Sequence, residues 1–186
     1  MMNARVIVYI ACVAILLSCS ACNEKKRTEK ELEVELRQFK EKAILFPDNL
    51  QAAIYGRQED PDTTLLHRAW KMVVYVDKSG CTGCKLRTLL PVYMFMLENK
   101  SDKDFGVVVI LNTPDKEETA QMLTDLRFRH TVFFDADGAF ERLNPQMPKK
   151  EEFHMFLLNG ENKVVLIGNP THNEKLNRLY LSAMKN

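Results

Sequence analysis

One stretch constrains the fold more than any other. Residues 79–85, SGCTGCK, lie between an apolar strand pattern and an apolar helix pattern. The run before them, residues 72–76, reads MVVYV, and the run after them, residues 86–97, is apolar over about three helical turns. We therefore expect a strand, a turn at Gly80, and a helix that begins at or just after Cys81.

The two cysteines of this stretch are candidates for a redox-active pair. A helix N-terminus presents unpaired N–H groups and the positive end of the helix dipole, and both favour a thiolate at Cys81. The CxxC spacing brings Cys84 within one helical turn of Cys81, so Cys84 can resolve a mixed disulfide formed there. Thr82 and Gly83 add neither bulk nor charge that would block a partner. We expect Cys81 to be the more exposed and the more acidic of the two.

Two other interpretations of the pair stay open at this point. The cysteines can form a static disulfide, or they can supply half of a zinc site. Zinc normally needs a second ligand pair, and the sequence contains no further CxxC and no HxxxH. The position between a strand and a helix favours the redox pair.

Residues 1–21 are predicted to be a lipoprotein signal peptide and lipobox region, with cleavage before Cys19, and not to be part of the fold. Arg5 supplies a positive start, and residues 6–17 form an apolar run. A run of about a dozen residues is too short to span a bilayer comfortably but has the length of a signal-peptide core. An ordinary signal peptide and an uncleaved membrane anchor are the alternatives.

The end of this segment resembles the lipobox of bacterial lipoproteins. Residues 16–19 read LLSC, and the resemblance implies that a lipid is attached to Cys19, which becomes the first residue after cleavage. Cys22 is a weaker candidate, because Cys19 would then occupy the position where leucine is usual. The mature chain would be tethered to a membrane in the bacterial cell envelope and face the periplasm or the exterior, where disulfides persist.

The remaining chain divides into a tether and one domain. Residues 22–64 are expected to form a tether, a helix over residues 31–43 and a loop, with an outer strand near residues 50–55. We expect residues 65–186 to form a single α/β domain. Its further elements are two strands at residues 105–112 and 131–134, helices at residues 113–126 and 139–143, a hairpin over residues 153–168 and a closing helix at residues 173–184.

This order of elements resembles a thioredoxin fold. The run Cys81-Thr82-Gly83-Cys84-Lys85 is similar to the thioredoxin CxxCK motif. The chain further resembles the thiol-specific antioxidant branch, and thioredoxin-like lipoproteins of Gram-negative bacteria, from about Trp70 to its end. The segments that carry this likeness are FFDADGAF at residues 133–140, FLLNGENKVVLIG at 156–168 and GNPTHNEK at 168–175. The resemblance implies a central mixed sheet flanked by helices, with an N-terminal helical extension.

Two departures from that family affect partner recognition. Thioredoxins carry a tryptophan directly before the first cysteine, where this chain has Gly80. They also carry a cis-proline just before the first hairpin strand, where this chain has Glu151 and Glu152. Pro148 lies a few residues upstream and is the proline that can approach the site.

Two further departures affect the tuning of the cysteines. Thioredoxins have a buried aspartate six residues before the first cysteine, and this chain has Tyr75 there. Asp77 can move protons and Lys78 can lower the pKa of Cys81. The alternative is that both are solvated charges at the end of a strand. Pro91 falls slightly later in the helix than the family's proline, so we expect a displaced kink. The candidates for tuning the pair are thus Asp77, Lys78, Gly80, Thr82, Gly83, Lys85 and Pro148.

Three functions are compatible with the sequence. The first is a thiol–disulfide oxidoreductase that exchanges with protein thiols and disulfides and needs no cofactor. The second is a copper-handling protein of the same fold, with Cys81, Cys84 and His154 as ligands. The third is a binding module without turnover. The formal net charge is +1 with both signs mixed along the chain, so we expect no nucleic-acid partner.

Overall fold

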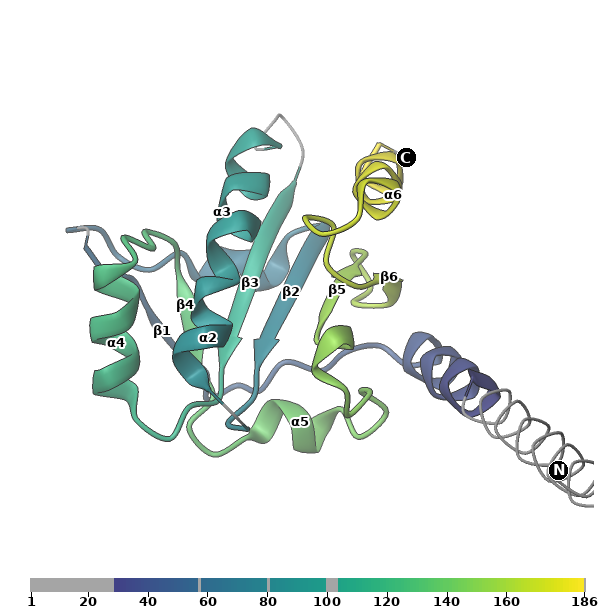
Figure 1. The fold of residues 1–186 in the computed structure, drawn as a ribbon, viewed down its shortest axis with the longest axis horizontal. Helices are drawn as coiled ribbons and strands as arrows, with labels where there is room; N and C mark the ends of the chain where they lie inside the picture. Colours follow the sequence, from purple (N-terminus) through teal and green to yellow (C-terminus); the bar gives the residue numbers. More distant parts are fainter. Residues whose placement is uncertain (1–28, 57, 80, 100–103, 186) are drawn as a thin grey trace, which may run out of the picture. The chain divides into compact units, whose positions relative to one another are not determined.

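The computed structural model describes residues 29–56, 58–79, 81–99 and 104–185, and Figure 1 shows the arrangement of their elements. The expected lipidation sites, Cys19 and Cys22, lie outside the described residues, and so does Gly80. Among the helices that are described, none is both long and apolar enough to cross a membrane.

The folded domain begins before residue 65, the boundary expected from the sequence. The chain divides into two compact units, Met1–Gln38 and Phe39–Asn186, and the second holds the whole sheet. Phe39 is fully buried and packs edge-on against Phe156, with 5.0 Å between ring centroids. The backbone N–H of Ile44 donates to the carbonyl of Asn162. Residues from Phe39 onward are therefore part of the core, because their apolar side chains cover one face of the sheet. Residues 29–41 are helical.

A six-stranded sheet forms the centre of the domain. Its strands are β1 (Gln51–Ala53), β2 (Trp70–Val76), β3 (Phe105–Leu111), β4 (Val132–Phe134), β5 (Met155–Leu158) and β6 (Val164–Ile167). The spatial order is β1-β4-β3-β2-β5-β6. β2, β3 and β4 pair in parallel, whereas β1, β5 and β6 join antiparallel. The predicted mixed sheet flanked by helices is confirmed.

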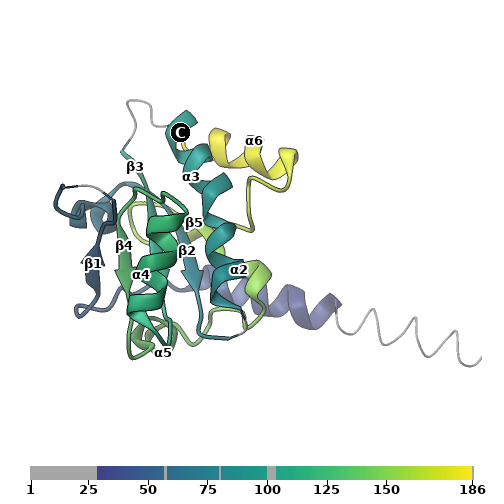
Figure 2. The same ribbon diagram turned by 60° about the vertical axis from the view of Figure 1, so that its left-hand side comes forward.

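Both faces of the central strands are buried. Successive side chains of a strand point to opposite faces, so Met72 and Val74 of β2 enter one core cluster and Val73 and Tyr75 enter the other. The first cluster is covered by helices α2 (Thr82–Arg87), α3 (Leu89–Glu98), α4 (Lys116–Asp125) and α6 (Glu174–Ala183). Figure 2 shows α4 and the α2–α3 pair in front of the sheet. The second is covered by α5 (Ala139–Leu143) and the N-terminal part of the domain.

The helix predicted over residues 86–97 is broken into α2 and α3 at Thr88. Pro91 has no N–H and its ring collides with the carbonyl four residues earlier, which belongs to Arg87. The Thr88 N–H turns back to the carbonyls of Lys85 and Leu86, and its hydroxyl also donates to the Lys85 carbonyl. The kink expected from Pro91 therefore lies one turn before the proline.

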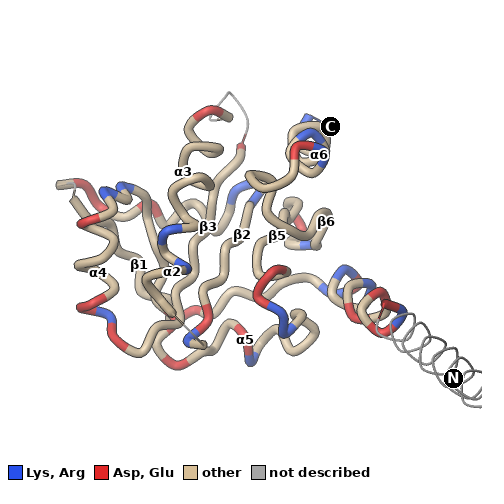
Figure 3. The backbone as a smooth tube through the Cα atoms, in the orientation of Figure 1, with Lys and Arg blue, Asp and Glu red and all other residues tan. Residues whose placement is uncertain are grey.

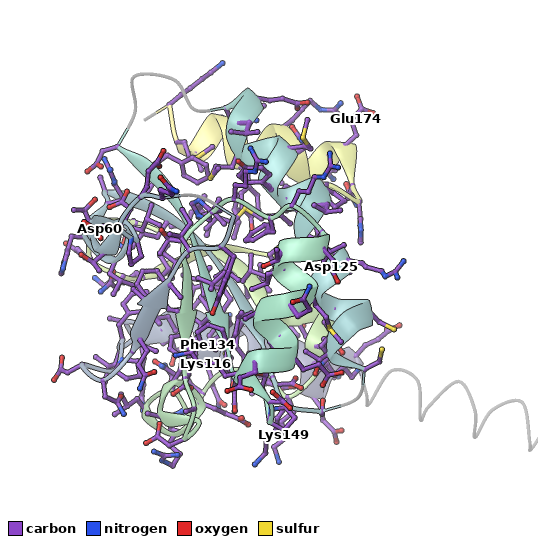
Figure 4. All side chains as sticks on the ribbon, turned by 90° about the vertical axis from the view of Figure 1, so that its left-hand side faces the viewer. Asp60, Lys116, Asp125, Phe134, Lys149 and Glu174 are labelled. Atoms are coloured by element: carbon purple, nitrogen blue, oxygen red, sulfur yellow. The ribbon has the colours of Figure 1, made fainter. Side chains whose placement is uncertain are left out.

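Helix α4 begins slightly later than the sequence indicated, and its first residue contacts strand β4. Asp115 caps it by accepting from the Glu118 N–H at 2.9 Å, so Pro114 lies outside the helix. Figure 4 shows Lys116 beside Phe134 of β4, with its Nζ 4.9 Å from the ring centroid. This attachment matters for the site, because the middle of α4 packs against α2.

Candidate active site

The CxxC turn places both thiols at the surface where α2 begins. Cys81 is the N-cap residue of α2 in an extended conformation, and its Sγ accepts a hydrogen bond from the Cys84 N–H at 3.2 Å. Both cysteines are free thiols and both are exposed. The expectation that a helix starts just after Cys81 is thus met, and both thiols are open to solvent.

The two thiols are shifted in opposite directions. The hydrogen bonds from the Cys84 thiol and from the N–H groups of Cys84 and Gly83 lower the pKa of Cys81, and Arg87 lowers it further. The hydrogen bond to Cys81 and its negative charge raise the pKa of Cys84. A thiolate therefore forms first at Cys81, the order of acidity expected from its position at the helix N-terminus.

Lys85 follows Cys84 and points inward instead of toward solvent. Its side chain is 8% exposed, and its Nζ lies 2.6 Å from Asp77 Oδ1 and 3.4 Å from Glu151 Oε2. The same Asp77 oxygen accepts from the Ser79 N–H at 2.7 Å and from the Ser79 hydroxyl at 2.5 Å. Burial alone would raise the pKa of Asp77, but the hydrogen bonds from Lys85 and Ser79 outweigh it and hold the pKa below its usual value. Asp77 is therefore a carboxylate.

His154 lies on the far side of this carboxylate, just before β5. Its Nε2 is 2.9 Å from the Pro148 carbonyl oxygen, and its Nδ1 is 3.3 Å from Asp77 Oδ2. Figure 3 shows basic residues on α2 and adjoining acidic and basic residues on the segment that leads into β5. Asp77 thus contacts Ser79, Lys85 and His154 through its two carboxylate oxygens.

The alternative copper ligands, Cys81, Cys84 and His154, are not brought together. Nε2 of His154 faces the Pro148 carbonyl and Nδ1 faces Asp77. Neither ring nitrogen is therefore directed at Cys81 or Cys84. Within the described part of the chain, no group of three histidine, cysteine or acidic side chains is placed to hold a metal ion. Pro148 is buried and contributes its carbonyl to His154, and the described peptide bonds are all trans.

Tyr75, at the position of the family's buried aspartate, does not replace that aspartate. It is 2% exposed, and burial raises its pKa to about 12, so it stays neutral at physiological pH. Its hydroxyl lies 3.3 Å from the Asn112 amide and 3.5 Å from a Glu141 carboxylate oxygen. The carboxylate near the cysteines is that of Asp77, two residues after Tyr75 and directly after the end of β2.

The sequence did not predict that Arg87 and Met122 contribute to the site, and Lys78 does not lie where it was expected. Arg87, rather than Lys78, is the basic residue that lowers the pKa of Cys81. Lys78 is exposed and lines a recess of about 490 Å³ with residues of α5 and the loop after it. A side chain added at Gly83 would meet the Met122 sulfur of α4 at 3.5 Å. The position of Arg87 one turn after Cys84 was readable, but the approach of α4 depends on tertiary packing.

Comparison with known proteins identifies the fold. No family model matches the sequence, and a search of curated proteins finds no match. Among solved structures, the chain is similar to one described as the thiol:disulfide interchange protein DsbE from Chlorobium tepidum. The TM-score is 0.55 and the identity 20%, over 77% of this chain and 98% of that one.

Two further structures have the same likeness. A protein described as a thioredoxin, from Neisseria meningitidis, matches with a TM-score of 0.51 and 18% identity, over 78% of this chain and 93% of that one. The thioredoxin domain of a thiol-disulfide oxidoreductase from Bacteroides vulgatus matches with a TM-score of 0.50 and 13% identity, over 75% and 99%. The chain therefore has a thioredoxin-like fold, with Cys81 and Cys84 as a CxxC pair at the start of α2.

Proposed function

We propose that this protein is a thiol–disulfide oxidoreductase of the bacterial cell envelope, tethered to a membrane through its N-terminus. The observation that carries the reaction is the unequal CxxC pair: both thiols are exposed, and the pKa is lowered at Cys81 and raised at Cys84. A nucleophile that ionises first, next to a thiol that stays protonated, is the arrangement that disulfide exchange requires. The named neighbours of the same fold include a thiol:disulfide interchange protein.

The reaction has two steps. The Cys81 thiolate attacks one sulfur of a partner disulfide, forms a mixed disulfide, and the other partner sulfur leaves as a thiolate. Cys84 then loses its proton to water, which its exposure allows, and attacks Cys81 Sγ. The Cys81–Cys84 disulfide forms and the second partner thiolate leaves. Two electrons pass from the protein to the partner, and the reverse sequence oxidises a partner dithiol.

The charges around the pair support this assignment of roles. Arg87 stabilises the Cys81 thiolate, whereas the ammonium of Lys85 is balanced by Asp77 and Glu151. The hydrogen bonds from Cys84 lower the pKa of Cys81 most, and the exposed Arg87 adds to this effect because a nearby cation stabilises a thiolate. The buried Lys85 serves mainly to hold the turn.

The tether rests on sequence alone. The LLSC run that ends at Cys19 follows an apolar segment of signal-peptide length. A lipid on Cys19 would hold the domain at a membrane on the oxidising side, where an exchanging pair has disulfide partners. Metabolic labelling with a radioactive fatty acid tests this: wild type should incorporate label and Cys19→Ala should not. Label retained in Cys19→Ala and lost in Cys22→Ala would move the attachment to Cys22.

An equilibrium redox titration of the purified full chain tests the reaction. The protein is equilibrated in dithiol buffers of graded potential, trapped with a thiol reagent and read by mass, with Cys84→Ser as the control that cannot form the internal disulfide. We expect a reversible two-electron transition between about −270 and −120 mV, the range of exchanging oxidoreductases. A pair that stays oxidised below about −300 mV would be a structural disulfide and would refute the proposal.

A further inference from the structure

His154 has a buried ring nitrogen, Nδ1, that has no hydrogen-bond partner when the ring is neutral. The residue is 6% exposed. Its Nδ1 makes no aligned hydrogen bond although it lies only 3.3 Å from Asp77 Oδ2. The separation is that of an ion pair, so the contact is electrostatic rather than a linear hydrogen bond. A buried polar atom in this position calls for a physical reason.

The other ring nitrogen determines where the proton is. Nε2 lies 2.9 Å from the carbonyl oxygen of Pro148. A carbonyl oxygen only accepts, so Nε2 must carry a hydrogen. In a neutral imidazole the remaining nitrogen, Nδ1, then has a bare lone pair, and this lone pair would face the carboxylate of Asp77. One further proton turns that repulsion into a charge-assisted contact.

The carboxylate in question holds both sides of the CxxC turn. Asp77 Oδ1 accepts from Ser79, two residues before Cys81, and from Lys85, directly after Cys84. Its Oδ2 is the oxygen that faces His154. The orientation of this one carboxylate therefore determines how the turn between Ser79 and Lys85 is held, and His154 is the group that contacts its second oxygen.

We propose that His154 is a positioning residue of the site: doubly protonated, it holds Asp77 Oδ2 and so orients the carboxylate that fixes both ends of the CxxC turn. In its effect on exchange, the inference rests on the proposed function. When the Nδ1 proton is lost, the carboxylate turns away from the bare nitrogen, and its contacts with Ser79 and Lys85 loosen. Several titratable or charged groups surround His154 and Asp77. They are Tyr75 of β2, Lys85 of α2, Glu151 before β5 and, beyond Tyr75, Glu141 of α5.

Nitrogen-15 NMR of the full chain tests the proton assignment directly. At pH 6 we expect two protonated ring nitrogens in His154, and the Nδ1 proton should be lost as the pH is raised. The backbone amide signals of Ser79 and Lys85 should move with the same midpoint, and Asp77→Asn should abolish that linked movement. A His154 ring with one proton, on either nitrogen, at pH 6 would overturn the proposal, as would Ser79 and Lys85 signals that ignore the titration.

Exchange kinetics between pH 5 and 9 test the consequence, with two matched variants. In His154→Gln the amide nitrogen falls near the position of Nε2, so the Pro148 contact is kept and the Asp77 contact is lost. In His154→Asn the amide nitrogen falls near Nδ1 and donates to Asp77 without titrating. Rates are divided by the Cys81 thiolate fraction, measured separately by alkylation.

The wild type should lose roughly threefold to tenfold in corrected rate as His154 deprotonates, the range of one weakened hydrogen bond to a charged group. His154→Asn should keep the faster rate throughout, and His154→Gln should show the slower rate at every pH. Identical corrected profiles in all three proteins would refute the positioning role. If no protein exchanges disulfides but the Ser79 signal still follows His154, the positioning role stands and the proposed function fails.

Discussion

Replacing the Asp77 carboxylate by an amide should destabilise the protein strongly. The Lys85 side chain is 8% exposed and that of Asp77 14%, with 2.6 Å between the charged atoms. In Asp77→Asn the buried ammonium keeps one acidic neighbour, Glu151 at 3.4 Å, whose side chain is 59% exposed and therefore well screened. The loss is that of a buried charge left without its main partner.

The magnitude follows from this geometry. Removing one partner of a buried ion pair costs about 3–5 kcal/mol. The asparagine oxygen still accepts a hydrogen bond and Glu151 remains near, so we expect a loss of about 2–3 kcal/mol in the free energy of unfolding. In a chain of this size that lowers Tm by roughly 5–10 °C. The control Lys85→Met should lose only about 1–2 kcal/mol, because Asp77 keeps its contacts with Ser79 and His154.

Urea unfolding of the reduced full chain at pH 7 measures the difference. Because the pKa of Asp77 is lowered in the folded protein, the contribution is fully present above the usual aspartate pKa of about 3.9 and is lost as pH falls through the lower folded value. The gap between wild type and Asp77→Asn should therefore close in strong acid. A variant within about 0.5 kcal/mol of wild type at pH 7 would show that the Lys85 pair does not hold the turn.

Three further predictions concern the cysteine pair and two glycines. In an alkylation profile against pH, Cys81 should react at lower pH than Cys84, and Arg87→Ala should move the Cys81 curve to higher pH, since the arginine lowers that pKa; a curve unchanged by Arg87→Ala, or Cys84 reacting first, would contradict the assignment. Gly83→Ala should stabilise by about 0.5–1 kcal/mol, because its Cβ meets the Met122 side chain at an ordinary 3.5 Å in a helix. Gly106→Ala should lower the free energy of unfolding by about 1–3 kcal/mol, because its Cβ would lie 2.9 Å from the side chain of buried Leu65. Thermal unfolding compares both, and equal Tm changes would refute the packing argument.

Local sequence patterns predicted the elements of the fold well. The apolar runs around residues 72–76 and 105–112 became β2 and β3, and the CxxC turn became the start of α2. The hairpin over residues 153–168 became β5 and β6, with Asn162 in the left-handed region of its loop. Such patterns succeed because burial on both faces of a central strand leaves a continuous apolar run.

Features that depend on contacts across the sequence were missed. The inward turn of Lys85 was not predicted, because a lysine after a CxxC pair is compatible with a solvent-exposed position until Asp77 is placed beside it. The role of His154 required the position of the Pro148 carbonyl, which only the folded loop provides. The domain start at Phe39 depends on packing against Phe156, more than 100 residues away.

Trapping the mixed disulfide shows whether Cys81 attacks and Cys84 resolves. Cys84→Ser and Cys81→Ser variants of the full chain are mixed with a disulfide-bonded peptide and read by mass at neutral pH. We expect a persistent peptide adduct on Cys81 in Cys84→Ser, and little or none in Cys81→Ser, because the remaining thiol has a raised pKa. An adduct that forms faster on Cys84, or on neither cysteine, would contradict it.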